Sequence, residues 1–352
     1  MPKPQSHLWP GVPLALGAAI LFGASTPVSK LLVGTVDPWL LAGILYLGAG
    51  VGLALMQWVR PLIGLTNAEA ALQKPDLLWL AAVVLFGGML GPLLLMFGLS
   101  QTSAASGALL LNLEGLATMA IAWIVFRENV DRRLLFGAAA ILCGAVLLSW
   151  NGHGLRPDTG GLLIAGACLC WGIDNNLTRK LSAADPVQIA TIKGLVAGGV
   201  NLVLALWLGA SLPDARFLAA GAVVGFLGVG VSLVMFMLGL RHLGTARTGA
   251  YFSLAPFIGA ILALVLFKDP ITVSLVAAGL LMALGLWLHL AERHDHEHVH
   301  DLLEHDHIHI HDAHHQHVHD GPVTEPHSHW HRHEPMRHKH PHYPDLHHRH
   351  GH

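Results

Sequence analysis

Long apolar stretches separated by short polar joints fill the first 290 residues of the chain. A helix needs about 20 apolar residues to cross the hydrocarbon core of a bilayer. Ten stretches of roughly this length can be marked, at 11–33, 38–59, 77–99, 102–126, 132–150, 159–181, 187–208, 216–240, 244–267 and 271–290. The pattern predicts an all-α integral membrane protein with ten transmembrane helices. The first stretch is read as an uncleaved helix, because nine further spans follow it.

The orientation follows from the Lys and Arg residues in the short joints, since these residues favour the cytoplasmic side. With the N-terminus inside, ten of them fall on the cytoplasmic side and four on the other. We therefore expect a multi-pass protein of the cell inner (plasma) membrane with both termini in the cytoplasm.

Two segments of the chain repeat each other. Residues 102–129 align without a gap with residues 243–270, at a spacing of 141. A weaker match joins Phe22-Gly23-Ala24-Ser25 to Trp171-Gly172-Ile173-Asp174. Each half then holds five spans, and an odd number places the halves in opposite orientations. This is the inverted-repeat plan of many secondary transporters.

On these features the chain resembles the drug/metabolite transporter superfamily, specifically its EamA-type members with two five-helix repeats. The resemblance covers roughly residues 10–290. It rests on the aromatic-glycine opening of each repeat, the small-residue start of the fourth helix and the acid that closes it. It implies a secondary carrier, often an exporter of amino acids or metabolites, with a central cavity. The family's fourth helix often carries a mid-helix proline. Pro256 matches it, whereas Gly115 stands there in the first repeat.

Glu114 lies in the middle of the fourth span. An ionised carboxylate at the bilayer centre costs about 2.5–3.5 kcal/mol on insertion scales. We therefore expect Glu114 to face a cavity, pair with a cation or hold a proton, which makes it a candidate proton carrier. The alternative is a buried carboxylate that is hydrogen-bonded to a neighbouring helix.

The sixth span carries three consecutive polar residues, Asp174, Asn175 and Asn176. Ser25 and Thr26 occupy the related place in the first span. Polar side chains at this depth cannot all face lipid without a large penalty. We predict that they line the substrate site, and the alternative is that they only hydrogen-bond helices together.

Two more residues complete the predicted substrate or coupling site. Lys193 lies six or seven residues into the seventh span. It is close enough to the end to reach water by snorkelling, and if it points inward it is the natural partner of Asp174 or Glu114. Tyr251 lies in the ninth span, on the same face as Arg247.

The tail from residue 291 has a very different composition. It holds 23 of the chain's 27 histidines, eleven acidic residues against five Lys or Arg, and few large apolar groups. Such a segment cannot bury enough surface to fold alone, so we predict disorder. Neutral imidazole is a common ligand for Zn, Ni, Co and Cu. The expected ligands are His294, His296, His298, His300, His305, His307, His309, His311, His314, His315, His317 and His319.

The predicted organisation is a cytoplasmic N-terminus at 1–10, repeats at 11–150 and 159–290 joined by a linker at 151–158, and the tail at 291–352. We expect the bilayer and a small-molecule or ion substrate as partners, no nucleic acid and no required cofactor, and a homodimer is left open. No nucleophile–base set, phosphate loop or cofactor motif is present, so we expect no enzyme.

Three functions are compatible with these patterns. The first is a secondary active transporter, an exporter of a metabolite or amino acid that works by alternating access with proton coupling. The second is a divalent metal transporter whose tail loads or senses the ion, although the spans lack the nitrogen and sulfur ligands that such ions prefer. The third is a membrane protein that buffers metal without transport.

Overall fold

The computed structural model describes residues 10–62, 72, 74–126, 130, 132–149, 158–178, 181, 185–243, 245–290, 297–300, 303–309, 327–333 and 336–339. The chain divides into two compact units. The first contains residues 1–65 and 70–291, and the second contains 66–69 and 292–352. The described elements of the first unit are helices, and the described strands belong to the second.

The helices of the first unit follow the predicted spans. The first repeat holds α1 Gly11–Val33, α2 Pro38–Leu62, η1 Lys74–Asp76, α3 Leu77–Val83, η2 Val84–Leu90, α4 Gly91–Gln101, α5 Ala104–Leu110, α6 Leu113–Phe126 and α7 Arg132–Leu148. The second holds α8 Thr159–Thr178, α9 Pro186–Trp207, α10 Ala215–Gly225, η4 Phe226–Val231, α11 Ser232–Leu243, α12 Thr245–Phe252, α13 Ala255–Phe267 and α14 Val273–Leu290. The predicted all-α membrane fold is confirmed.

Eight of the ten predicted spans are long and apolar enough by themselves to cross a membrane, within the described residues. The other two are also helical. Helix α7 has 17 residues, slightly short of a full crossing. Helix α8 has 20 residues, and its polar segment Asp174–Asn176 lowers its mean hydropathy.

The second helix of each repeat begins in the same way. Asp37 Oδ1 accepts the N–H of Trp39 at 2.9 Å, and Asp185 Oδ1 accepts the N–H of Val187 at 2.8 Å. Each aspartate is followed by a proline, which suits the first helical position because it has no N–H to satisfy. The two caps therefore define matching starts for α2 and α9.

Two helices of each repeat are interrupted, at matching positions. The third helix contains a π-helical segment, η2 in the first repeat and η4 in the second, with ends 141 residues apart at Leu90 and Val231. The fourth helix is broken by a turn, at 111–112 between α5 and α6 and at 253–254 between α12 and α13. Irregular backbone at membrane depth is tolerated where it lines protein or a cavity, and discontinuous helices form the binding sites of many transporters.

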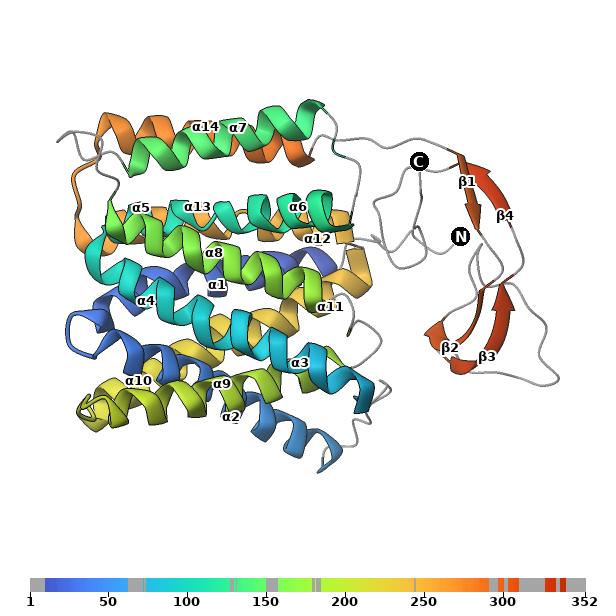
Figure 1. Cartoon of the computed structure of the whole chain (residues 1–352), viewed down its shortest axis with the longest axis horizontal. Helices are drawn as coiled ribbons and strands as arrows, with labels where there is room; N and C mark the ends of the chain where they lie inside the picture. The colour runs from blue at the N-terminus through green and yellow to red at the C-terminus, as the bar shows by residue number, and fades with distance from the viewer. Residues whose placement is uncertain are drawn as a thin grey trace, which may run out of the picture. The chain divides into compact units, whose positions relative to one another are not determined.

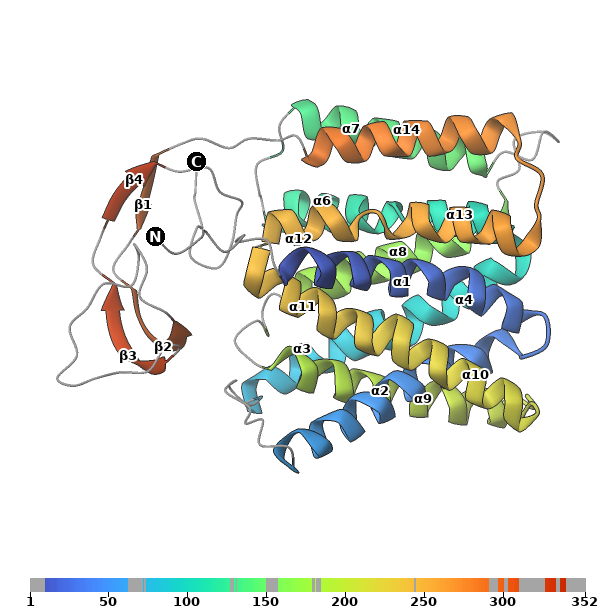
Figure 2. The same cartoon turned by 180° about the vertical axis from the view of Figure 1, so that it is seen from behind.

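The two repeats interlock, as Figures 1 and 2 show from opposite sides. Helix α2 packs against α9, and α7 packs against α14, so each pairs with its counterpart in the other repeat. Helix α1 packs against α11 and α13, and α8 packs against α4 and α6. The first helix of each repeat thus contacts the third and fourth helices of the other repeat, and the pattern is the same in both directions, as an inverted repeat requires.

Glycines allow α2 and α9 to approach closely. A Cβ added to Gly194 would lie 2.6 Å from the backbone nitrogen of Gly50, and one added to Gly43 would lie 2.7 Å from that of Leu202. Such small-residue contacts are typical of helix pairs within membranes. Large apolar side chains face outward elsewhere, including Ile124 and Trp207 with 73% and 81% of their surface exposed, as expected for contact with lipid.

The described residues of the second unit lie in two short strand pairs. Strand β1 Glu297–His300 pairs antiparallel with β4 Met336–Lys339, and β2 Leu303–His309 pairs antiparallel with β3 His327–His333. Histidine alternates with other residues in β1, β2 and β3, and a period of two suits an extended chain. A two-stranded sheet is marginally stable in water by itself, so composition alone does not predict it.

Candidate functional site

A buried ion pair joins helices α8 and α9. Asp174 of α8 is 5% exposed, and its Oδ2 pairs with Nζ of Lys193 of α9. The other oxygen, Oδ1, accepts a hydrogen bond from Thr178 Oγ1 at 3.3 Å. Lys193 therefore points inward and does not snorkel to the surface. A lone charge in this buried position would be very unfavourable. Each charge of the pair offsets the desolvation cost of the other.

The backbone of the π-helical segment η2 lies against this pair. A Cβ added to Gly87 would lie 2.6 Å from Lys193 Nζ, so only glycine leaves room. The Gly87 carbonyl accepts hydrogen bonds from Tyr46 Oη at 2.9 Å and from Trp171 Nε1 at 3.1 Å.

The local sequence explains why this carbonyl is free to accept side chains. The Gly91 N–H bonds to the Phe86 carbonyl in the π-helical pattern, so Gly87 cannot use it. One residue further, Pro92 has no N–H to offer. The Gly87 carbonyl thus lacks a helical partner and is satisfied by Tyr46 and Trp171 instead. The sequence did not predict Gly87, Tyr46 and Trp171 as site residues. The signal that could have found them was Pro92, which follows Gly87, Gly88 and Gly91.

Glu114 lies in the first turn of α6, directly after the break in the fourth helix. Its Oε1 accepts a hydrogen bond from Asn175 Nδ2 at 3.1 Å, and Asn175 Nδ2 also lies 3.1 Å from Thr118 Oγ1. The break is stabilised by Asn112, whose Nδ2 donates to the Leu109 carbonyl at 2.8 Å. A carboxylate at a helix N-terminus is stabilised by the helix dipole, by about 0.3–1 kcal/mol at exposed sites.

Asn176 joins α8 to α6. Its Nδ2 donates to the carbonyls of Thr118 at 3.0 Å and Gly172 at 2.8 Å. Its Oδ1 is buried and accepts no hydrogen bond from the described residues. A flipped amide would place that oxygen against two carbonyls, so the orientation is well determined. Asn176 therefore links α8 to α6 through its amide nitrogen and leaves one acceptor unused.

The predicted residues of the first span make their printed contacts outside this cluster. Ser25 Oγ donates to the Phe22 carbonyl at 2.6 Å, and Thr26 is buried. A Cβ on Gly228 of η4 would lie 3.2 Å from Ser25 Oγ. Ser25 thus faces the second π-helical segment, as Asp174 faces the first. Tyr251, half-buried in α12, has no hydrogen bond to the cluster among the described residues.

The cluster is therefore asymmetric. Asp174 of α8 pairs with Lys193 and lies near Glu114 of α6, whereas Ser25, its counterpart in α1 of the first repeat, is neutral. Of the predicted site residues, Glu114, Asp174, Asn175, Asn176 and Lys193 are brought together between α6, α8 and α9. Ser25, Thr26 and Tyr251 are not part of this group.

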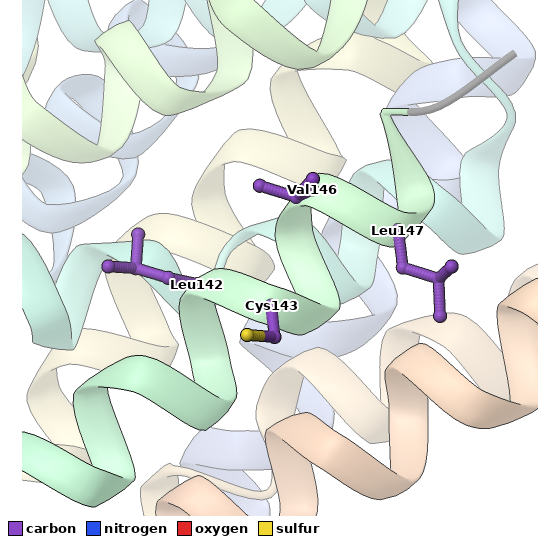
Figure 3. A pocket seen from close by; sticks show the side chains of 4 residues that line it. All are labelled: Leu142, Cys143, Val146 and Leu147. Atoms are coloured by element: carbon purple, nitrogen blue, oxygen red, sulfur yellow. The ribbon is translucent and has the colours of Figure 1, made fainter.

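An apolar depression lies elsewhere, on the face of α7. Leu142, Cys143, Val146 and Leu147 line it (Figure 3), and no residue of the polar cluster takes part. A lining of this kind offers no group that would orient a polar substrate. The depression is best regarded as part of the surface that meets lipid.

The metal predictions fall on the tail. His294, His296, His311, His314, His315, His317 and His319 lie outside the described residues. His298 and His300 belong to β1, and His305, His307 and His309 belong to β2. The described residues contain no group of three or more His, Cys, Asp or Glu side chains placed to hold a metal ion. Metal binding by the tail stays a prediction.

Replacing Gly87 with alanine tests the packing of this site. The added methyl group would collide with Lys193 and Asp174, so we expect a loss of about 1–3 kcal/mol in the free energy of unfolding. Gly199→Ala is the matched control, since its Cβ would meet open space within helix α9. Thermal unfolding of both variants in detergent measures the difference, and equal stability would contradict this account of Gly87.

Comparison with known proteins gives consistent results. A 29% identical relative from Methanothermobacter thermautotrophicus, an "uncharacterized transporter", aligns with 80% of this chain and 86% of its own length. The uncharacterized transporter YyaM of Bacillus subtilis is 24% identical, over 78% of this chain and 91% of its own. A solved crystal structure covers 79% of this chain and 97% of its own at 19% identity, with a TM-score of 0.59, which shows a shared fold.

The model of the EamA-like transporter family matches residues 9–150 and again residues 158–291. The two matches together take in the whole helical part of the chain. The protein is accordingly a multi-pass membrane transporter for a small-molecule substrate and not an enzyme. The chain belongs to the EamA-like transporter family.

Proposed function

We propose that this transporter is a secondary active exporter of a small metabolite or amino acid, which works by alternating access and is coupled to protons. The observation that carries the proposal is the polar cluster of Glu114, Asp174 and Lys193, which lies beside the break in the fourth helix and the π-helical segment of the third. Transporters bind substrates and coupling ions at such interrupted helices near the bilayer midplane.

The charges of the cluster support proton coupling. Lys193 neutralises Asp174, whereas Glu114 is met by the neutral amide of Asn175. The cluster therefore holds one more carboxylate than ammonium group. A carboxylate without a cation at this depth is strongly destabilised, so a proton or a positively charged substrate group would bind there with a large gain. If a proton and the positively charged substrate group bind to Glu114 in turn, their exchange couples transport to the proton gradient.

The interrupted helices support alternating access. Each repeat contributes one π-helical segment and one broken helix, and both kinds of irregularity mark places where a helix bends at low cost. Because the interruptions match between repeats, the bundle can exchange the conformations of its two halves. Such an exchange would open the central site to one side of the membrane and then to the other.

The second candidate is transport of a divalent metal ion, favoured by the 23 histidines of the tail. Zn, Ni, Co and Cu prefer imidazole and thiolate ligands. The cluster instead offers carboxylate and amide groups, and Cys168 Sγ is already engaged with the Leu110 carbonyl at 3.7 Å. The metabolite proposal therefore ranks first. We further propose the inner membrane as the location, with both termini in the cytoplasm.

Transport assays in proteoliposomes test these alternatives. Purified full-length protein is compared with a chain truncated after Leu290, with and without a pH gradient, using radiolabelled amino acids, nickel, cobalt and zinc. We expect amino-acid flux that the pH gradient accelerates and that survives truncation, because the cluster lies within residues 1–290. Metal flux from both chains, with no organic substrate carried, would overturn the first proposal in favour of the second.

A further inference from the structure

The polar side chains that join α6 to α8 have no hydrogen-bond donor left over. Asn175 Nδ2 donates to Glu114 Oε1 and to Thr118 Oγ1, both at 3.1 Å. Thr118 Oγ1 donates in turn to the backbone carbonyl of Glu114 at 2.9 Å. Asn176 Nδ2 donates to two backbone carbonyls. An amide nitrogen has two hydrogens and a hydroxyl group has one, so these side chains have used all of their donors.

The same side chains keep acceptor oxygens without a partner among the described residues. These oxygens are Glu114 Oε2, Asn175 Oδ1 and Asn176 Oδ1. Asn176 Oδ1 is buried in a residue that is 2% exposed, and a buried acceptor without a donor is unfavourable. A ligand that binds between these residues must therefore donate hydrogen bonds.

Packing does not seal the carboxylate of Glu114. Glu114 is partly exposed, and Asn175, to which it is bonded, is exposed. Gly115 follows Glu114 in the first turn of α6, and a Cβ added to it would have no neighbour within 4 Å. The matching residue of the second repeat is Pro256, so the open space belongs to one repeat only in the sense that glycine leaves it there. A small ligand can thus reach the carboxylate without displacing a packed side chain.

The charges around Glu114 decide which kind of donor is favoured. Among the described residues, the titratable side chains that interact with it electrostatically are Asp174, Lys193, Cys168 and Tyr46. Thiol and phenol groups are uncharged at neutral pH. Asp174 and Lys193 form an ion pair and add no net charge. The deprotonated cluster therefore has one uncompensated negative charge, which a single cationic nitrogen of a ligand would neutralise.

We propose that this transporter selects substrates with a net charge of +1, a cationic amine or a basic amino acid, and exchanges one such substrate for one proton at Glu114. The inference rests on the proposed function and names its substrate class. An ammonium group has three donors and no acceptor, so it supplies both the charge and the hydrogen bonds that the cluster lacks. Exchange of one monocation for one proton moves no net charge. Export then follows the pH gradient and does not respond to the membrane potential, which acts only on net charge.

Lysine and glutamine are a matched pair of test substrates, because both carry an amino-acid head group and differ in the charge of the side chain. Flux of each radiolabelled amino acid is measured in proteoliposomes with a fixed pH gradient, while potassium and valinomycin set the membrane potential. We expect kcat/KM to be about tenfold or more higher for lysine, since hydrogen bonds to a charged group are the stronger ones. Lysine flux should be the same at every potential.

Glu114→Gln removes the negative charge but keeps an acceptor for Asn175. We expect lysine to bind this variant about 10–100-fold more weakly in calorimetric titrations in detergent, with little change for glutamine. Asp214→Asn removes a carboxylate from the exposed surface and is the matched control, which should keep the preference for lysine.

The outcomes separate this inference from the proposed function. Equal proton-driven transport of lysine and glutamine would overturn the inference and leave the proposed function intact, and so would lysine flux that follows the membrane potential. No lysine flux at all would also overturn it. If metal ions alone are carried, the proposed function fails together with the inference.

Discussion

Lys193→Met lowers the free energy of unfolding by about 3–5 kcal/mol, because it leaves Asp174 as an uncompensated charge that is 5% exposed. The methionine has nearly the volume of the lysine stem, so packing changes little. Thermal unfolding of the purified protein in detergent measures the loss. The same substitution should also abolish transport, since the negatively charged cluster then has no cation of its own.

The double variant separates charge from packing. Combining Lys193→Met with Asp174→Leu removes both charges, and replacing a buried ion pair by apolar groups is often neutral or stabilising. We therefore expect the double variant to regain most of the stability that the single variant loses. Equal losses in the single and double variants would mean that Lys193 contributes mainly through its aliphatic stem.

Glu114→Gln reduces transport driven by a pH gradient by about tenfold or more, which corresponds to about 1.4 kcal/mol of coupling. The glutamine keeps an oxygen that can accept the hydrogen bond from Asn175, but it can no longer bind and release a proton. Stability should be retained or slightly improved, since an unpaired carboxylate at this depth is unfavourable. Substrate flux in proteoliposomes, with and without the gradient, gives the measurement.

The control for this substitution is Asp214→Asn. Asp214 is exposed and pairs with Arg216 at 3.3 Å near the start of α10, where a surface ion pair contributes little. Its transport should match that of the unchanged protein under both conditions. Gradient-driven flux that persists in Glu114→Gln at the control level would remove Glu114 from the coupling mechanism and leave its interhelical hydrogen bond as its role.

Several properties of this protein were determined by the sequence alone. The spans could be found because each membrane helix satisfies its own backbone and needs only a local apolar run of sufficient length. The inverted repeat was visible as a spacing of 141 residues, and the structure adds matching interruptions of the third helices at that same spacing. Glu114 and Asp174 stood out because a charge inside an apolar run is unusual wherever the helix packs.

Other properties were decided only by the tertiary structure. Lys193 could snorkel or turn inward, and its position opposite Asp174 settled this. The partnership of Gly87 with Tyr46 and Trp171 joins three helices and left only an indirect trace in Pro92. Ser25 matched Asp174 in the repeat, but it faces Gly228 of η4, whereas Asp174 faces Gly87 of η2. Hydropathy depends on neighbours along the chain, whereas the meeting of side chains depends on how helices distant in sequence pack together.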